Sequence, residues 1–215
     1  MTLKETLDQQ NVTLVAVSKT YPPERIMAEY EKGQRIFGEN RVQELTAKYE
    51  VLPKDIQWHQ IGHLQRNKIK YIASFVHLIH AVDSFELLQE IDRQAAKHQR
   101  VIDCLLQFHI AQEDTKFGFS EDEAVTLLEQ QPWPQLQHVR ICGVMGMATY
   151  TDDETIVRQE FRYLKKIFEH LRQRFFTDAP SFKEISMGMS GDWHIAVEEG
   201  STMVRIGSLI FGNRN

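Results

Sequence analysis

Lys19 is the residue whose place in the sequence best suits a chemical role. It ends the apolar run 13–18 (TLVAVS), and a lysine at the end of a buried strand is partly desolvated. Desolvation lowers the pKa of an amine, which makes it available as a nucleophile that forms a Schiff base with an aldehyde. The alternative is a lysine whose stem packs at the strand end while its amine reaches water. Lys19 alone leaves both roles open.

Two short segments that contain glycine and serine could hold an anion. Ser190 precedes Gly191 after the seventh apolar run, and Gly207 precedes Ser208 after the eighth. Backbone N–H groups and hydroxyls at such turns suit a phosphate, although each glycine could equally serve a tight turn. A Schiff-base lysine opposite a phosphate site indicates an aldehyde-bearing phosphate cofactor, and pyridoxal phosphate is the obvious candidate.

Arg205 lies in the eighth run, just before Gly207. It would be placed to hydrogen-bond the pyridine nitrogen of such a cofactor. Because a guanidinium does not readily give up its proton, it would keep that nitrogen neutral and weaken the electron sink. The alternative is a structural role, in which Arg205 forms a buried ion pair with a neighbouring strand.

Signatures of other site chemistries are missing from the sequence. It contains neither GxGxxG nor GxxxxGK[ST], which weakens dinucleotide and P-loop interpretations. His59 and His63 are not part of an HExxH motif, and His77 and His80 are expected on opposite faces of a strand. The sequence therefore predicts no metal site. A net charge of −5 argues against general binding to nucleic acid.

A repeating pattern of elements positions these residues. Short apolar runs alternate with segments of helical periodicity, which implies parallel strands and right-handed crossovers. Eight repeats predict a closed (β/α)8 barrel, with an open doubly wound sheet as the alternative. No linker or change in composition divides residues 1–215, so we expect one domain, with a short segment 1–12 before the first strand. The eight runs are 13–18, 35–37, 56–61, 76–82, 101–110, 139–145, 182–187 and 203–206.

Seven helical segments are expected between and after these runs. Pro23 and Gly33 mark the start and the end of the first, Ser84 is an expected N-cap, and Ser120 with Glu123 forms an expected capping box. The expected segments are 23–32, 41–49, 65–74, 84–98, 120–130, 153–175 and 193–198.

Polar or chemically distinctive residues gather near the carboxyl ends of the predicted strands. In a barrel of this kind, binding and chemistry occur at that end, while the opposite end serves stability. We therefore expect these residues to converge on one mouth, although the chain spreads them over nearly its whole length. They are Lys19, Asn40, His63, Asp83, Met145, Ser190 and Arg205.

Six ordered motifs carry a resemblance to a known family. They are LVAVSKT (14–20), FGENRVQE (37–44), WHQIGHLQRNK (58–68), GVMGM (143–147), MGMSGD (187–192) and GSTMVRIGSLIFG (200–212). Through them the chain closely resembles the YggS/PROSC family of pyridoxal phosphate homeostasis proteins. The resemblance implies the α/β TIM barrel of the alanine racemase N-terminal-domain type (fold type III).

The same resemblance assigns expected roles to residues. It implies that Lys19 holds pyridoxal 5'-phosphate (PLP) covalently as a Schiff base, and that Arg205 faces the pyridine nitrogen. Ser190 and the backbone of Gly207 and Ser208 would hold the phosphate. Asn40, His63 and Met145 would line the pocket. Two stretches depart from the family pattern: the segment before the first strand is short, and 113–118 (EDTKFG) matches only loosely.

The resemblance also implies a biological role. Family members are known as PLP carriers or regulators of vitamin B6 and amino-acid pools, without an established catalytic activity. We therefore expect a PLP carrier rather than an enzyme, since racemases of this barrel type need a second domain, and eight β/α units already occupy this chain from Thr13 to Phe211. The alternatives are a PLP-dependent amino-acid racemase-like enzyme and an interaction protein that uses PLP as a structural ligand.

Several further expectations concern partners and cellular context. Apo PLP-dependent enzymes are the expected recipients, Lys116 is a candidate for capturing the aldehyde during transfer, and a monomer is expected.

Residues 1–10 lack the apolar stretch of a signal peptide, and no run approaches a membrane span. Cys104 and Cys142 are far apart in apolar runs, so reduced thiols and a cytoplasmic location are expected.

Overall fold

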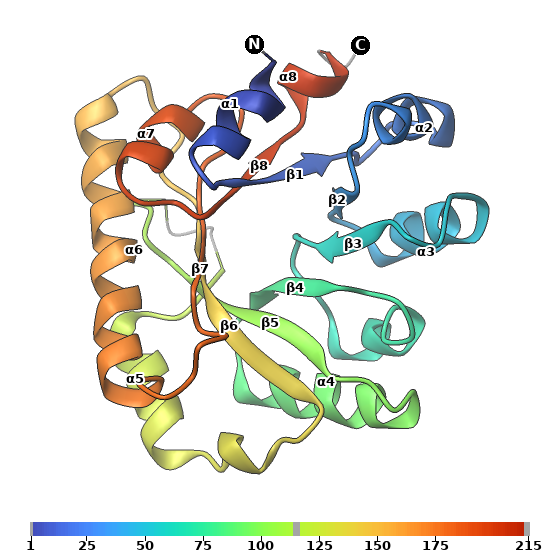
Figure 1. Ribbon diagram of the computed structural model, residues 1–215. Coiled ribbons are helices and arrows are strands. Elements are labelled where there is room, and N and C mark those ends of the chain that lie inside the picture. The colour runs from blue at the N-terminus through green and yellow to red at the C-terminus, as the bar shows by residue number, and fades with distance from the viewer. Residues whose placement is uncertain (1, 114–116, 213–215) are drawn as a thin grey trace.

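A closed barrel of eight parallel strands forms the centre of the molecule (Figure 1). The computed structural model describes residues 2–113 and 117–212. Each strand pairs with its neighbours in the sequence, and β8 closes the barrel onto β1. The predicted (β/α)8 barrel is therefore confirmed, and the open doubly wound sheet is excluded. The strands are β1 (Thr13–Val17), β2 (Ile36–Glu39), β3 (Gln57–Gln60), β4 (Leu78–Val82), β5 (Ile102–Phe108), β6 (Val139–Gly146), β7 (Glu184–Ser186) and β8 (Met203–Ile206).

Helices surround this barrel on its outer side (Figure 1). The predicted caps are present, because the Ser84 side chain accepts from the Leu87 N–H and Ser120 forms a capping box with Glu123. The elements outside the sheet are α1 (Leu3–Gln9), α2 (Pro23–Glu31), α3 (Val42–Val51), η1 (Arg66–Tyr71), α4 (Phe85–Lys97), α5 (Glu121–Gln130), η2 (Trp133–Gln135), α6 (Glu154–Phe175), α7 (Trp193–Glu198) and α8 (Ser208–Phe211).

The segment between β3 and β4 differs from the expected α-helix over 65–74. It forms the shorter 3-10 helix η1 instead. Ile69 and Ile72 lie three residues apart and are both fully buried. The three-residue turn of a 3-10 helix brings residues at this spacing to the same side, so burial of these two isoleucines suits the tighter helix.

The helix α1 precedes the first strand and is not predicted by the apolar pattern. Its signal is the capping box of Thr2 and Glu5, with hydrogen bonds in both directions. Leu7 of α1 is fully buried and packs in one cluster with Leu14 of β1 and Val204 of β8. The short segment before β1 therefore covers the outer side of the seam where the barrel closes.

Strand alternation divides the buried residues into two sets. Val15, Leu105 and Met203 belong to a cluster inside the barrel, whereas Phe37 and Ile79 belong to the larger cluster between the sheet and the helices. This period of two follows from side chains that point alternately to the two faces of a strand. It also decides which polar residues face the barrel interior.

The two cysteines fall on opposite sides of this division. Cys104 packs with the outer cluster and Cys142 with the interior cluster, and both are free thiols. Burial raises the pKa of the Cys104 thiol, and it raises that of Cys142 to about 12. Burial thus favours the protonated form of both thiols. In the described part of the chain, no helix combines the length and the apolar character needed to cross a membrane.

Candidate functional site

Lys19 lies just beyond the carboxyl end of β1 and is half-buried. The next residue, Thr20, has a φ of 70°, which is unusual for a β-branched residue and costs conformational energy. The turn is held by hydrogen bonds from Ser18 N to Gly38 O at 3.1 Å and from Tyr21 N to Ser18 O at 3.1 Å. A strained backbone next to Lys19 therefore depends on its surroundings to stay in place.

A buried ion-paired cluster, which we call the outer clasp, holds both neighbours of Lys19. It comprises Ser18, Glu39, Glu44 and Lys48. The Lys48 Nζ donates to Ser18 O at 2.7 Å, to Glu39 Oε1 at 2.7 Å and to Glu44 Oε1 at 2.6 Å. Ser18 Oγ donates to Glu39 Oε1, and Thr20 N donates to Glu44 Oε1, both at 2.5 Å. The clasp thus ties the Lys19 segment to β2 and α3.

Two of the three charges of the outer clasp are well removed from water, while the Glu44 side chain is 24% exposed. Glu39 is completely buried and Lys48 is 5% exposed. Burial raises the pKa of the Glu39 carboxyl to about 6, although the Lys48 ammonium and the Ser18 hydroxyl oppose this shift. One oxygen of the carboxylate, Glu39 Oε2, has no hydrogen-bond partner in the described part of the chain. The sequence pattern did not single out this cluster, because its members are spread over the segment after β1, the strand β2 and the helix α3.

The structure brings Ser190 and Gly207 together beside β1. The Gly207 N–H donates to Ser190 Oγ at 3.3 Å. A Cβ at Gly207 would lie 3.1 Å from Val17 O, so glycine permits β8 to approach the end of β1 closely. Ser208 is exposed and begins α8, and the first N–H groups of a helix have no partner within it. A hydroxyl and backbone donors therefore gather near the Lys19 segment.

Arg205 is buried inside the barrel and is held by two neutral groups. Its Nη1 donates to Ser186 Oγ at 2.6 Å, and its Nη2 donates to Gly146 O at 3.0 Å. Burial lowers the pKa of Arg205 to about 10, with the Asp192 carboxylate acting in the opposite direction. The guanidinium therefore stays charged at neutral pH and is fixed in orientation by these hydrogen bonds. Met145, next to Gly146 on β6, is fully buried in the interior cluster.

Asn40 lies at the end of β2 against the end of β3. Its backbone oxygen accepts a hydrogen bond from Gln60 Nε2 at 2.9 Å. A Cβ at Gly62 would come within 2.7 Å of the same oxygen, so this close approach also requires glycine. Asn40 and the segment that leads to His63 are thus neighbours, as expected from their places after adjacent strands.

His63 and Asp83 link the ends of β3 and β4. The His63 Nδ1 lies 3.3 Å from Asp83 Oδ2, and the imidazole stacks on Phe117 with ring centroids 4.2 Å apart. His63 is largely exposed, so its ring stands at the rim rather than inside the barrel. The structure therefore brings together two contact groups, Ser190 with Gly207 and Asn40 with Gln60 and Gly62, at the ends of strands on either side of β1.

A chain of polar side chains inside the barrel was missed by the sequence analysis. His59 on β3 contacts His80 on β4, with Nδ1 and Nε2 2.9 Å apart, and His80 Nδ1 lies 2.9 Å from Ser186 Oγ on β7. Because Ser186 also accepts from Arg205, these four residues form a continuous lumen chain. The signal was available: each is a polar residue at an inward position of an apolar run.

The histidines of this region also correct one sequence-based expectation. His77 was expected on the face opposite to His80, but it precedes β4, so strand alternation does not apply to it. Its ring stacks with that of His59 at 5.7 Å between centroids. His59 and His77 both line a cavity of about 520 Å³ at the amino-terminal end of the barrel.

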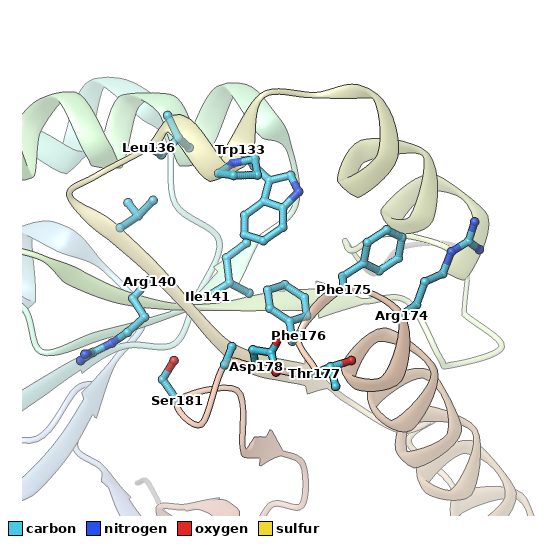
Figure 2. A pocket seen from close by; sticks show the side chains of 13 residues that line it. Trp133, Leu136, Arg140, Ile141, Arg174, Phe175, Phe176, Thr177, Asp178 and Ser181 are labelled. Carbon is cyan, nitrogen blue, oxygen red and sulfur yellow. The ribbon is translucent and has the colours of Figure 1, made fainter.

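Another cavity of about 520 Å³ lies away from the expected site residues (Figure 2). It is bounded by η2, the start of β6 and the segment that follows α6. Trp133 and Phe176 contribute aromatic rings 5.2 Å apart, and Arg140 and Asp178 contribute charge. Because it adjoins the amino-terminal end of β6, it belongs to the end of the barrel that serves stability.

Two expectations concern metals and the loop after β5. Among residues 2–113 and 117–212, no three His, Cys, Asp or Glu side chains are grouped so that they could hold a metal ion. Lys116, the candidate for aldehyde capture, lies outside the described residues.

Comparisons with known proteins place this geometry in a family. The model of the alanine racemase N-terminal domain matches residues 1–215. A pyridoxal phosphate homeostasis protein of Aquifex aeolicus is 41% identical over 202 residues, which cover 94% of this chain and 86% of the relative. PipY of Synechococcus elongatus, solved without PLP, is 37% identical with a TM-score of 0.87 and coverage of 97% and 98%.

PipY has also been solved with PLP bound, and that structure matches at 36% identity with a TM-score of 0.84 over the same shares of both chains. Both likenesses extend over nearly the whole of both chains. The chain therefore belongs to the family of pyridoxal phosphate homeostasis proteins, within the group that the alanine racemase N-terminal domain defines.

Proposed function

We propose that this protein binds PLP at the carboxyl end of its barrel and acts in PLP homeostasis. The main support is the position of Lys19, which follows β1 and lies between the two contact groups. The names of the relatives and the PLP-bound structure of PipY agree with this function.

The donor groups of the site suit PLP. The aldehyde of PLP condenses with a lysine amine, with loss of water, to give a Schiff base that absorbs visible light. Lys19 would supply that amine. Ser190 and the backbone N–H groups of Gly207 and Ser208 would hold the phosphate, since hydroxyls and the N–H groups of a turn bind anions.

The remaining predicted residues would orient the ring. Arg205 would face the pyridine nitrogen as a donor that keeps its own proton, which holds that nitrogen neutral. Asn40, His63 and Met145 would line the pocket, with His63 at its rim. The outer clasp would fix the backbone on both sides of Lys19.

We propose further that the protein carries PLP and does not catalyse turnover. The names of the relatives support this role, because they are described as homeostasis proteins. Apo PLP-dependent enzymes are the proposed recipients. A single barrel domain over residues 1–215, a monomeric state and aldehyde capture by Lys116 complete the proposal.

The deciding experiment locates the covalent bond. Purified protein is loaded with PLP, its visible absorption is recorded, and the complex is reduced with borohydride and mapped by peptide mass spectrometry. We expect the adduct on Lys19 and loss of the band in Lys19→Arg, which keeps the charge. Lys32→Arg, at an exposed helix end, is the matched control and should behave as wild type. An adduct on another lysine, or none, contradicts the assignment.

A racemase-like activity is the second candidate, and membership of the alanine racemase N-terminal-domain group favours it. The PLP-loaded protein is incubated with a panel of L-amino acids while optical rotation is followed. A carrier leaves the rotation unchanged. Sustained loss of rotation that disappears in Lys19→Arg would establish an enzyme.

A further inference from the structure

The lumen chain crosses the barrel interior from one side to the other. His59 and His80 lie on β3 and β4, whereas Ser186 and Arg205 lie on β7 and β8. The exposed fractions of these four residues are 2%, 0%, 0% and 4%, respectively. The contacts between successive members measure 2.9, 2.9 and 2.6 Å, which are ordinary hydrogen-bond lengths. A fully buried polar path therefore connects Arg205 to the opposite wall of the barrel.

The chemistry of its members gives the chain a direction. A guanidinium has no acceptor, so Ser186 Oγ must accept from Arg205 Nη1. The hydroxyl proton of Ser186 is then available for His80 Nδ1, which makes that nitrogen an acceptor. The Nε2 of His80 consequently carries the proton of a neutral ring and donates to His59 Nδ1. His59 is left with its own proton on Nε2.

The reverse direction would satisfy fewer buried groups. His59 Nδ1 would donate to His80 Nε2, and His80 Nδ1 would donate to Ser186 Oγ. Ser186 would then accept twice, and its hydroxyl proton would lose the acceptor that His80 supplies. His59 Nε2 has no partner in the described part of the chain in either case. Because an unpaired buried polar group is costly, the direction from Arg205 to His59 is favoured.

The chain also requires both rings to be neutral. Burial lowers the pKa of His59 to about 3, and burial lowers that of His80 well below its ordinary value, with smaller contributions from His59 and Arg205. A proton added to either ring would remove an acceptor from the chain and place a second positive charge in the lumen. Arg205 is thus the only charged member of the lumen chain at neutral pH.

We propose that Ser186, His80 and His59 are positioning residues that form a one-way hydrogen-bonded chain and hold the Arg205 guanidinium toward the cofactor site. This role rests on the proposed function, in which Arg205 faces the pyridine nitrogen. Ser186 holds Nη1 while Gly146 O holds Nη2, so the plane of the guanidinium cannot rotate freely. His80 fixes the hydroxyl of Ser186, and His59 in turn fixes the tautomer of His80.

The direction of the chain is tested in the cofactor-free protein. The histidines are labelled with ¹⁵N, and long-range ¹H–¹⁵N correlation spectra at neutral pH report which ring nitrogen carries the proton. We expect Nε2–H tautomers for both His59 and His80, assigned with His59→Asn and His80→Asn. A proton on Nδ1 of either ring, or a doubly protonated ring, would contradict the proposed direction of the hydrogen bonds. This measurement does not depend on PLP.

The positioning role is tested with two variants of His80. In His80→Asn the amide oxygen can replace Nδ1 as the acceptor for Ser186, whereas His80→Leu removes the acceptor. We expect PLP to bind about tenfold more weakly to His80→Leu, an effect of the size of roughly one hydrogen bond, and its visible band to shift. The Asn variant should stay close to wild type in both measurements.

The outcomes separate this inference from the proposed function. Unchanged affinity and an unchanged spectrum in His80→Leu overturn the positioning role while PLP binding stands. Equal losses in the Leu and Asn variants also overturn it, because a lost acceptor would then not be the cause. Failure of the wild-type protein to bind PLP overturns the proposed function and, with it, the positioning role, whatever tautomers the cofactor-free protein shows.

Discussion

The outer clasp and the lumen chain are two buried polar clusters on opposite sides of the same barrel wall. The outer clasp lies between β2 and α3 and balances full charges, Lys48 against Glu39 and Glu44. The lumen chain lies inside the barrel and contains neutral rings and a hydroxyl around one charge, that of Arg205. One cluster holds the Lys19 segment, and the other holds Arg205.

The difference shows two ways to meet the cost of burying polar groups. A buried charge needs a partner of opposite sign, or it must lose its charge by a shift in pKa. The Glu39 carboxylate keeps a partner, and burial still raises its pKa to about 6. His59 and His80 instead give up the proton, since burial lowers both pKa values. The two clusters should therefore respond to acid in opposite directions.

Removal of one charge from the outer clasp should have the largest effect on stability. Lys48→Met leaves the completely buried Glu39 carboxylate without its ammonium partner. We expect the free energy of unfolding, measured with urea, to fall by about 3–5 kcal/mol. The double variant Glu39→Met/Lys48→Met should be more stable than the single variant, because no unpaired buried charge remains. A double variant as unstable as the single one would contradict the role of charge pairing.

Acid should weaken the protein through the lumen chain. The folded pKa of His59, about 3, lies below the unfolded value of 6.5, so its stabilising contribution is present above pH 6.5 and is lost as the pH falls toward 3. Between about pH 7 and about pH 5 this loss amounts to about 2 kcal/mol. His59→Asn keeps an acceptor for His80 and does not titrate. Its unfolding free energy should fall by about 2 kcal/mol less than that of wild type over this range, and an equal fall would refute the assignment.

The outer clasp should show a smaller effect of opposite sign. The folded pKa of Glu39, about 6, lies above the unfolded value of 4.5, so its favourable contribution is present below pH 4.5 and is lost as the pH rises through 6. Acidification from about pH 7 to about pH 5 should therefore gain about 1 kcal/mol from this carboxyl. Glu39→Gln removes that gain, and urea unfolding at the two pH values measures it. A pH profile identical to wild type would show that Glu39 does not titrate in this range.

Removal of an exposed ion pair should have the smallest effect on stability, and it serves as a reference for the buried pairs of the outer clasp. Lys4 and Asp8 are 2.7 Å apart on α1, with side chains 42% and 55% exposed. Lys4→Ala should change the free energy of unfolding by no more than about 0.5 kcal/mol, because water and salt screen exposed charges. A loss comparable to that of Lys48→Met would mean that pairing matters more than burial.

Much of the fold followed from local patterns. The runs that end near Lys19 and Asn40 are strands because apolar residues repeat there, and the caps at Ser84 and Ser120 form from hydrogen bonds within a few residues. The helix α1 was missed because it has only seven residues, although its capping box is present in the sequence. The segment η1 was predicted as an α-helix and is a 3-10 helix. The two are hard to distinguish from the sequence because they differ in spacing by less than one residue per turn.

The candidate site was predictable in part. Lys19, Ser190 and Arg205 stand at strand ends, and the eight-fold repeat implies that strand ends converge. The contact of Gly207 with Ser190 agrees with that expectation, whereas the roles of these residues toward PLP stay predictions until they are measured. His59 and His80 escaped notice because their partners lie 21 and 106 residues away in the chain, and the contact of Lys48 with Ser18 O spans 30 residues.

The sequence by itself determined the repeat, the strand ends and the family, because apolar periodicity and ordered motifs are properties of the chain. Only the tertiary structure decided which polar residues are buried together. Closure of the barrel brings β3 and β4 opposite β7 and β8, and the packing of α3 on β2 buries Lys48 against Glu39. Burial and partner distance set the charge state of each group, and neither quantity exists before the chain has folded.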